Sequence, residues 1–267
     1  MPDCPTADTF FATSWCRIAY DQELARWADY ALPAARKSVT DPQHEKWLRC
    51  AGTWFAGVNA LPNDGDGALA GGPPLRGAAL DFIANTLQLS GFAWDRAQVS
   101  VIYPHYPRQM VEESDAAFRY RVQRDAAHVD GMIPEGPARR RHLRQHHAFL
   151  LGIPLLRASA DAAPFVVWEG SHKIIRARLR AFFGAIPPSD WGDVDATAAY
   201  VDARAAVFDS CRRIEVCAQP GEAYVVHRLA VHGMARWGEH ASADSDGRMI
   251  AYFRPEMARP EAWLDAP

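Results

Sequence analysis

Residues 220–233 read PGEAYVVHRLAVHG, and this stretch carries the clearest fold signal in the sequence. A Pro-Gly turn opens it, and the apolar residues 223–231 that follow predict a buried strand. The strand ends in His232, which places an imidazole at the end of a buried element. His227 lies five residues earlier, on the opposite face of a regular strand, and we interpret it as a core or supporting residue. The alternative for His232 is a buried histidine hydrogen-bonded to the backbone.

Further short strand candidates lie on both sides of this segment. They are residues 98–103, 118–123, 149–156, 165–168, 213–217 and 248–253. Helical patterns interrupt the series near 171–209, and strand and helix do not alternate regularly. Short strands separated by turn signals favour a sandwich or jelly roll over a parallel sheet. The sequence therefore predicts a mainly β protein with helical additions.

The first 97 residues predict a mainly helical region. Asp21 is a candidate N-cap for a helix that Pro33 would end, and Asp41-Pro42 offers a second helix start. Residues 62–74 are rich in Gly, Asp and Pro and predict a loop, while residues 75–89 predict another helix. The composition shows no break that would make this region a separate domain.

Composition and charge exclude several function classes. The chain has 267 residues, of which 49% are hydrophobic and 23% charged, so a sizeable core is available and global disorder is excluded. The net charge of -3 gives no electrostatic reason for binding nucleic acid or a membrane surface. We therefore expect no nucleic-acid and no membrane partner.

The sequence also carries no visible targeting or redox signal. The five cysteines form no C-x-x-C pair, and the first residues show no signal-peptide pattern. The longest apolar run, residues 149–156, is far too short to cross a bilayer. These features predict a cytoplasmic protein.

A candidate metal site begins at His128-Val129-Asp130. Residues two apart on a strand point to the same face, so the imidazole and the carboxylate can reach one ion. Chance supplies about one such triplet in a chain of this composition, and a loop histidine beside a solvated aspartate is the alternative. Together with His232, however, the pair makes the two-histidine, one-carboxylate set of non-heme Fe(II) oxygenases.

Arg248 lies sixteen residues after His232, at the head of the last strand candidate. A dicarboxylate cosubstrate needs a fixed cation at its far end, and arginine supplies a two-pronged donor for it. Arg254 shares the same strand face and is the competing choice.

The order of these parts resembles the phytanoyl-CoA dioxygenase family of Fe(II)/2-oxoglutarate oxygenases. The supporting stretches are HVD at 128–130, VVWEGSHK at 166–173, PGEAYVVHRLAVHG at 220–233 and GRMIAYFRPE at 247–256. The resemblance covers roughly residues 98–256 and implies a double-stranded β-helix, the fold of cupins and jelly rolls. It implies His128, Asp130 and His232 as iron ligands and Arg248 as the partner of the distal carboxylate of 2-oxoglutarate. Residues 1–267 would then form a single oxygenase domain, with residues 1–97 packed outside the barrel.

The chain departs from the family pattern in four places. Glu169 stands where the family usually has proline, and Glu222 replaces the more common aspartate. The gap between His232 and Arg248 is a few residues longer than usual. The basic segment 139–147, RRRHLRQHH, stands where the family pattern predicts that the strand after H-x-D has already begun. This segment is either a solvated loop or an anion-binding lid.

The stretch Gly170-Ser171-His172-Lys173 has a stronger structural than functional interpretation. Ser171 is a candidate N-cap for the helix that follows, and the glycine permits the turn. We interpret His172 as a supporting or structural residue and not as a metal ligand.

These features predict an Fe(II)/2-oxoglutarate-dependent dioxygenase that uses O2 to hydroxylate a small molecule, with release of succinate and CO2. Asp130 argues against a halogenase, because the halogenases among these enzymes need a small residue in place of the carboxylate to bind the halide. The alternatives are a jelly-roll metalloprotein with non-oxidative, isomerase-type chemistry and a protein that only binds. The substrate and the oligomeric state are left open.

Overall fold

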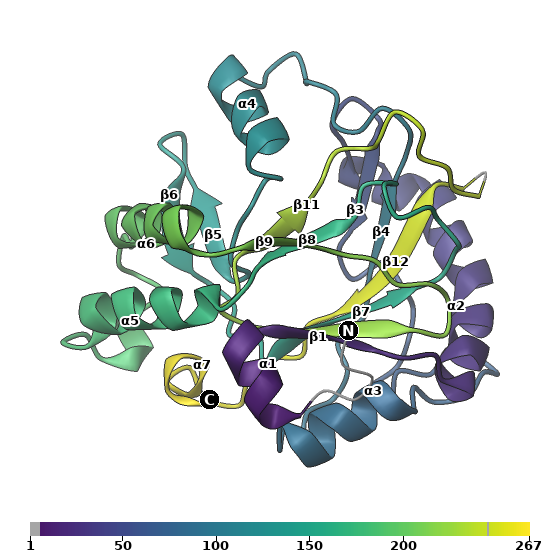
Figure 1. The fold of residues 1–267 in the computed structure, drawn as a ribbon, viewed down its shortest axis with the longest axis horizontal. Coiled ribbons are helices and arrows are strands. Elements are labelled where there is room, and N and C mark those ends of the chain that lie inside the picture. The colour runs from purple at the N-terminus through teal and green to yellow at the C-terminus, as the bar shows by residue number, and fades with distance from the viewer. Residues whose placement is uncertain (1–5, 245) are drawn as a thin grey trace.

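Two antiparallel sheets face each other across a common interior in the computed structural model (Figure 1), which describes residues 6–244 and 246–267. The large sheet has the strand order β1-β10-β7-β12-β4-β3-β2, the smaller sheet β11-β8-β9, and β5-β6 form a separate hairpin. The strands are β1 Trp15–Ile18, β2 Leu48–Arg49, β3 Trp54–Gly57, β4 Gln98–Ile102, β5 Met132–Glu135, β6 Arg140–Leu143, β7 Phe149–Pro154, β8 Phe165–Trp168, β9 Arg213–Val216, β10 Ala223–His227, β11 His232–Met234 and β12 Arg248–Phe253.

The interior between the sheets is apolar at its centre. Alternate residues of the facing strands fill it, among them Phe165, Tyr224, Val226, Ile250 and Tyr252. The hydroxyl of Tyr224 donates to that of Tyr252 at 2.7 Å, so both buried phenols have a polar partner. Gly152 is required on β7, because a Cβ there would lie 2.4 Å from the Tyr224 ring.

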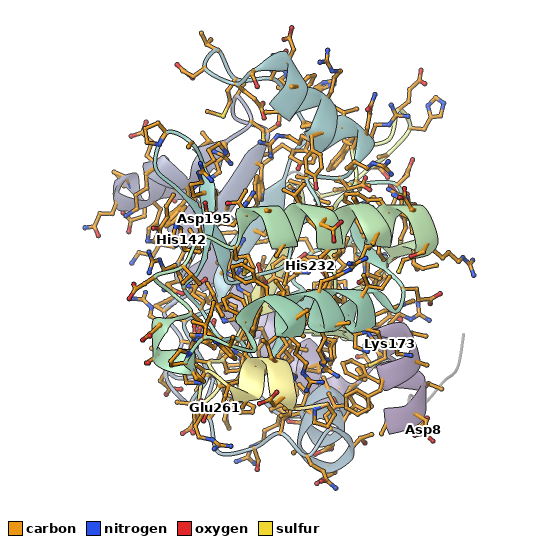
Figure 2. All side chains as sticks on the ribbon, turned by 90° about the vertical axis from the view of Figure 1, so that its left-hand side faces the viewer. Asp8, His142, Lys173, Asp195, His232 and Glu261 are labelled. Carbon is orange, nitrogen blue, oxygen red and sulfur yellow. The ribbon has the colours of Figure 1, made fainter. Side chains whose placement is uncertain are left out.

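Helices cover the outer face of each sheet. The helices of the chain are α1 Ala7–Thr13, α2 Gln22–Thr40, α3 Ala78–Asp81, α4 Asp115–Gln123, α5 Ser171–Phe183, α6 Thr197–Ser210 and α7 Ala262–Asp265, with the 3-10 helices η1 Pro42–Trp47 and η3 Pro188–Asp190 and the π-helix η2 Phe82–Thr86. Helix α4 stands apart from both sheets (Figure 1). The first three pack on the large sheet, where Trp27 is fully buried and donates to the Gly67 carbonyl at 2.7 Å. Helices α5 and α6 lie side by side over the small sheet (Figure 2).

The predicted strands at 98–103, 149–156, 165–168, 213–217 and 248–253 are confirmed within a residue or two. The segment 223–231 is shorter than predicted. Strand β10 ends at His227 and a turn leads to β11 at His232, so the two histidines belong to different sheets.

The prediction of a mainly helical N-terminal region is only partly right. Strand β1 pairs with β10 at one edge of the large sheet, and the β2–β3 hairpin pairs with β4 and extends the other edge. These strands have two to four residues, too few to show a period-2 pattern.

Two element predictions are wrong. Helix α2 continues through Pro33 to Thr40, because Pro33 lies on the exposed face while Ala31, Ala35 and Ser38 continue the buried stripe. The segment 118–123 is part of helix α4 and not a strand; Ser114 caps this helix, and none of its residues is buried. The alternation of polar and apolar residues there reflects no sheet face.

Two local predictions need smaller corrections, and a third is confirmed. The helix expected over 75–89 is limited to α3 and the wider turn η2, while Asp41 does cap a helix, the 3-10 helix η1. Gly170, with φ of 74°, occupies the N-cap position of α5 in place of Ser171. The Ser171 hydroxyl instead accepts a hydrogen bond from the Val231 amide at 2.8 Å, which ties the helix to the residue before His232.

No helix among the described residues combines the length and the apolar character needed to cross a membrane. Cys4 and the other residues of 1–5 lie outside the described part of the chain.

Candidate metal centre

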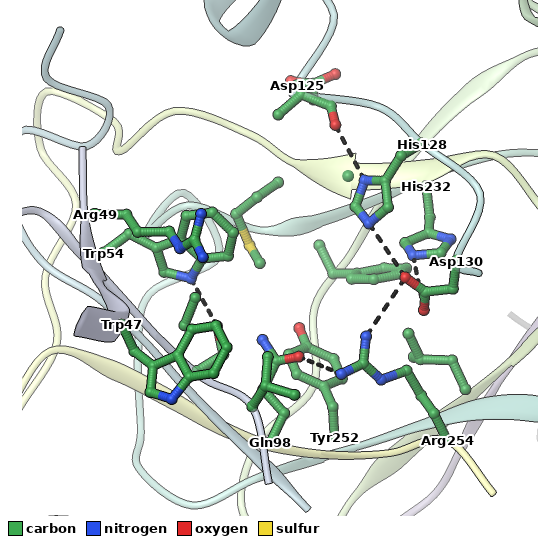
Figure 3. A pocket seen from close by; sticks show the side chains of 18 of the residues that line it. Trp47, Arg49, Trp54, Gln98, Asp125, His128, Asp130, His232, Tyr252 and Arg254 are labelled. Carbon is green, nitrogen blue, oxygen red and sulfur yellow. Dashed lines mark hydrogen bonds and ion pairs between the residues drawn. The ribbon is translucent and has the colours of Figure 1, made fainter. Parts of the chain in front are cut away.

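His128, Asp130 and His232 come together at one end of the space between the sheets (Figure 3). One potential ligand atom from each lies within 4.8 Å of the others. The two histidines are paired through their backbones, since each amide donates to the other's carbonyl at 2.8 and 2.9 Å. The H-x-D segment, which forms no strand of its own, thus meets the start of β11 through a single antiparallel bridge.

The hydrogen bonds of the two imidazoles define which ring nitrogen faces the centre. Nδ1 of His128 lies 3.1 Å from the Ala126 carbonyl, and Nδ1 of His232 lies 2.9 Å from the Ala230 carbonyl. A carbonyl accepts only, so in both rings Nδ1 carries the proton and the lone pair is on Nε2. Both Nε2 atoms face Asp130, at 3.3 and 3.6 Å.

Asp130 is held as a carboxylate. Its side chain is only 11% exposed, and Nη1 of Arg254 lies 3.5 Å from its Oδ1. Burial by itself would raise the pKa of Asp130, but the positive charge of the nearby Arg254 guanidinium opposes this effect, and the pKa lies well below its usual range. Nη2 of Arg254 donates to Gln98 at 2.6 Å, which fixes the guanidinium beside the carboxylate.

Helix α6 holds the H-x-D segment from behind. The Val129 amide, between the two candidate ligands, donates to the hydroxyl of the fully buried Tyr200 at 2.8 Å. Arg204, one turn further on, donates to the Ala127 carbonyl at 3.0 Å. The helical insert therefore positions the candidate ligands through their backbone.

We expect Tyr200→Phe to lower the affinity for Fe(II) about 10- to 100-fold, the range typical of residues that orient metal ligands. The change leaves the buried Val129 amide without a partner, so the segment between the ligands is free to move. Equilibrium metal titration checks the prediction against Tyr30→Phe, whose ring is 52% exposed. An unchanged affinity in a folded Tyr200→Phe protein would contradict it.

The three side chains line a cavity of about 240 Å³. Its inner wall is formed by residues of β7, β8, β11 and β12, and the Phe165 ring stacks on His232 at 5.4 Å between centroids. Its outer wall comes from the β2–β3 hairpin and β4. An apolar cavity with a few convergent polar groups is typical of a small-molecule site.

The two candidate arginines occupy different places. Arg254 lies at the cavity beside Asp130, where it is already paired. Arg248 is only 6% exposed and lies behind Met234 and Tyr252, with its Nη1 3.0 Å from the Met234 sulfur. Among residues 6–244 and 246–267, no carboxylate forms an ion pair with Arg248. A buried cation without an anion is costly, and this arginine is therefore suited to an anionic ligand.

His227 and His172 do not belong to this cavity. Their rings lie 4.5 Å apart, beneath the N-terminus of α5, and both residues are 2% exposed. Arg176 and Arg228 lie beside them, and Arg228 donates to carbonyls of the C-terminal segment. The cluster joins α5, the end of β10 and α7.

This cluster predicts a loss of stability in acid. Burial, with Arg176 and Lys173, lowers the pKa of His172 to about 4, while an unfolded histidine titrates near 6.5. Between these values the unfolded chain binds a proton that the folded chain does not. The free energy of unfolding therefore decreases as the pH is lowered. Between pH 7 and 4.5, His172 contributes about 2 kcal/mol of this loss. Denaturant unfolding at pH 7 and 4.5 measures it; His172→Gln should flatten the dependence, and the exposed His240→Gln should leave it unchanged.

The basic segment 139–147 forms part of the β5–β6 hairpin and is not seen as a lid over the centre. Arg140 pairs with Asp195 at 2.6 Å and Arg144 with Glu135 at 2.5 Å. Nδ1 of His147 donates to the carbonyl of Arg254, just after β12, at 2.8 Å. The solvated interpretation fits these ion pairs better than the anion-binding one.

Two departures from the family pattern have local structural partners. Glu222 accepts from the Gln219 amide at 2.8 Å within the turn before β10. Glu169 accepts from the Trp15 indole at 3.2 Å and so connects the segment after β8 to β1.

Sequence reasoning missed the groups that other elements bring to the site. Tyr200 and the hairpin residues Arg49 and Trp54 carry no motif that marks them. In the structure Arg49 directly precedes the turn Cys50 to Gly52, whose residues have positive φ angles, and Trp54 follows it by two residues.

Comparisons with known proteins show the fold. The epimerase SnoN, solved with Fe3+, alpha ketoglutarate (2-oxoglutarate) and nogalamycin RO, is 16% identical, with 97% of this chain and 87% of SnoN covered and a TM-score of 0.50. EvdMO1 is 12% identical with a TM-score of 0.50; the match covers 95% of this chain but only 49% of EvdMO1. EctD from S. alaskensis, solved with 2-oxoglutarate and 5-hydroxyectoine, is 14% identical, with 96% and 78% covered and a TM-score of 0.46.

At these identities the likeness confirms the predicted double-stranded β-helix with helical additions. No protein-family model and no curated protein matches the sequence.

Proposed function

We propose that this protein is a non-heme Fe(II)/2-oxoglutarate-dependent dioxygenase. The observation that carries the proposal is the convergence of two Nε2 lone pairs and one ionised carboxylate at one end of a jelly-roll interior. Two histidines and a carboxylate on one face are the ligand set of such enzymes. Solved proteins with this fold hold iron and 2-oxoglutarate, as SnoN does, which supports the proposal.

The residues at this site fit both iron and 2-oxoglutarate. Lone pairs of three side chains that face one another repel unless a cation lies between them, and His128, Asp130 and His232 are arranged in this way. The buried Arg248 lacks an anion and lies behind the same cavity, so it fits the distal carboxylate of 2-oxoglutarate. When bound, iron and 2-oxoglutarate would supply the oxidative decarboxylation, giving succinate and CO2, that is coupled to oxidation of a substrate C–H bond.

The chain itself would orient the ligands and exclude water. Tyr200 and the carbonyls of Ala126 and Ala230 fix the H-x-D segment and the imidazole tautomers. Arg254 lies 3.5 Å from Oδ1 of Asp130, so it would orient this carboxylate and partly neutralise its charge. Phe165 and the apolar residues of the inner wall would limit the access of water to the metal.

Hydroxylation of a small molecule is the proposed outcome, and membership of the phytanoyl-CoA dioxygenase family is proposed on the four sequence stretches. The fold by itself supports a wider range, because solved proteins that share it include an epimerase and a carbocyclase. The position of the substrate carbon relative to the metal would decide among these outcomes.

The test is succinate formation from 2-oxoglutarate by the Fe(II)-loaded protein. We expect slow, O2-dependent succinate release even without substrate, and none with Asp130→Ala. Succinate release that is independent of O2, or equal in wild type and Asp130→Ala, would contradict the proposal. Turnover of a substrate without O2 or 2-oxoglutarate would favour the isomerase-type alternative.

A further inference from the structure

The wall of the cavity opposite the candidate metal centre is built by the β2–β3 hairpin. Arg49 and Trp54 are directly opposite each other in this hairpin, so their side chains share the face that lines the cavity. Trp47 precedes the hairpin and lines the same wall. Figure 3 shows these three side chains across the cavity from His128, Asp130 and His232.

The cation on this wall is the exposed side chain of Arg49. Within residues 6–244 and 246–267, Arg49 forms no ion pair with a carboxylate, and its guanidinium lies 5.5 Å from the centre of the Trp47 ring. The other carboxylates of the cavity are occupied: Asp130 faces Arg254, and Asp125 accepts from Arg213 at 2.7 and 2.9 Å. The outer wall therefore presents a guanidinium that is exposed to solvent and has no carboxylate partner among the described residues.

The rest of this wall is aromatic and rigid. The Trp54 indole donates to the Ser100 hydroxyl at 3.1 Å and meets the Tyr106 ring edge-on at 6.3 Å, so its orientation is fixed from two sides. Flat aromatic surfaces bind planar rings through stacking and through their large apolar area. The small side chains of Ala56 and Val58 line the same cavity.

We propose that the substrate is a planar aromatic small molecule that carries an anionic group, a carboxylate or a phosphate. The ring packs against Trp47 and Trp54, and the anionic group pairs with Arg49. The end of the molecule away from the anion then points across the cavity to the candidate metal centre. This inference rests on the proposed function for the reaction, but the binding site is a property of the wall itself.

The test uses three probes of one shape: 2-naphthoate, 2-naphthyl phosphate and the uncharged 2-naphthamide. Quenching of tryptophan fluorescence in the metal-free protein measures their binding, which needs neither iron nor turnover. We expect at least one of the two anions to bind about tenfold more tightly than the amide, as expected for a charge-assisted contact. Arg49→Gln should remove this preference and leave the affinity for the amide unchanged.

The matched control is Arg124→Gln, because Arg124 also stacks on an aromatic ring, that of Phe208, but does not line the cavity. This variant should keep the preference for the anion. Equal binding of the anions and the amide, no binding of any probe, or a preference that survives Arg49→Gln would overturn the inference. A different result would contradict the proposed function alone: the Fe(II)-loaded protein would release no succinate, while the metal-free protein would still prefer the anions.

Discussion

Asp130→Ala is expected to lower the affinity for Fe(II) by at least about 100-fold, more than the loss typical of residues that only orient ligands. The carboxylate is the one anionic donor among the three converging side chains, and its pKa lies well below its usual range, so it is ionised throughout neutral pH. Without it, a divalent cation would meet two imidazoles and the nearby Arg254 guanidinium. Equilibrium titration with Fe(II) under anaerobic conditions measures the change.

Two further variants make this result specific. Asp130→Asn keeps the shape of the side chain and removes its charge, and we expect it to lose the metal nearly as fully as the alanine variant. Asp161→Ala removes an exposed aspartate that does not line the cavity and should bind Fe(II) normally. Tight binding by either Asp130 variant would exclude this residue as a ligand.

Arg248→Met is expected to weaken 2-oxoglutarate binding on the order of 100-fold while leaving Fe(II) binding unchanged. The guanidinium is the unpaired buried cation behind the cavity, and loss of a charged hydrogen-bonding partner of this kind costs about 2–5 kcal/mol. Methionine fills much of the same volume. Because the change removes a buried charge without an anion, the unfolding temperature of the metal-free protein should not fall.

Weaker 2-oxoglutarate binding at an unchanged unfolding temperature indicates a binding role. If Arg248 had a structural role, its replacement would lower the stability as well. Arg248→Lys keeps the charge but loses the two-pronged contact. Its affinity for 2-oxoglutarate should lie between those of the wild type and Arg248→Met. Arg254→Met is the comparison variant on the same strand face. If it lost 2-oxoglutarate binding and Arg248→Met kept it, the assignment of the two arginines would be reversed.

The core strands of the jelly roll could be predicted because their signal is local. Runs such as 149–156 and 248–253 are apolar and bounded by turn residues, and they form β7 and β12 in the centre of the large sheet. Edge strands and surface helices lack that signal. Strand β2 has two exposed residues, and α4 buries none, so their conformations are set by pairing with β3 and by the Ser114 cap.

The candidate metal residues could be predicted for a similar reason. His128 and Asp130 are two apart on one segment, and His232 ends a recognisable strand. Tyr200 and Arg49 reach the same site from a helical insert and from the N-terminal hairpin. Only the folded chain places them there, because no spacing in the sequence relates them to H-x-D.

The most direct test of the central claim is the anaerobic absorption spectrum of the protein with Fe(II), recorded before and after addition of 2-oxoglutarate. It needs no knowledge of the substrate. The account predicts a weak visible charge-transfer band that forms only with both components and is absent in Asp130→Ala and His232→Ala. Fe(II) binding without such a band would contradict the role of 2-oxoglutarate, and a protein that does not bind Fe(II) would contradict the metal centre itself.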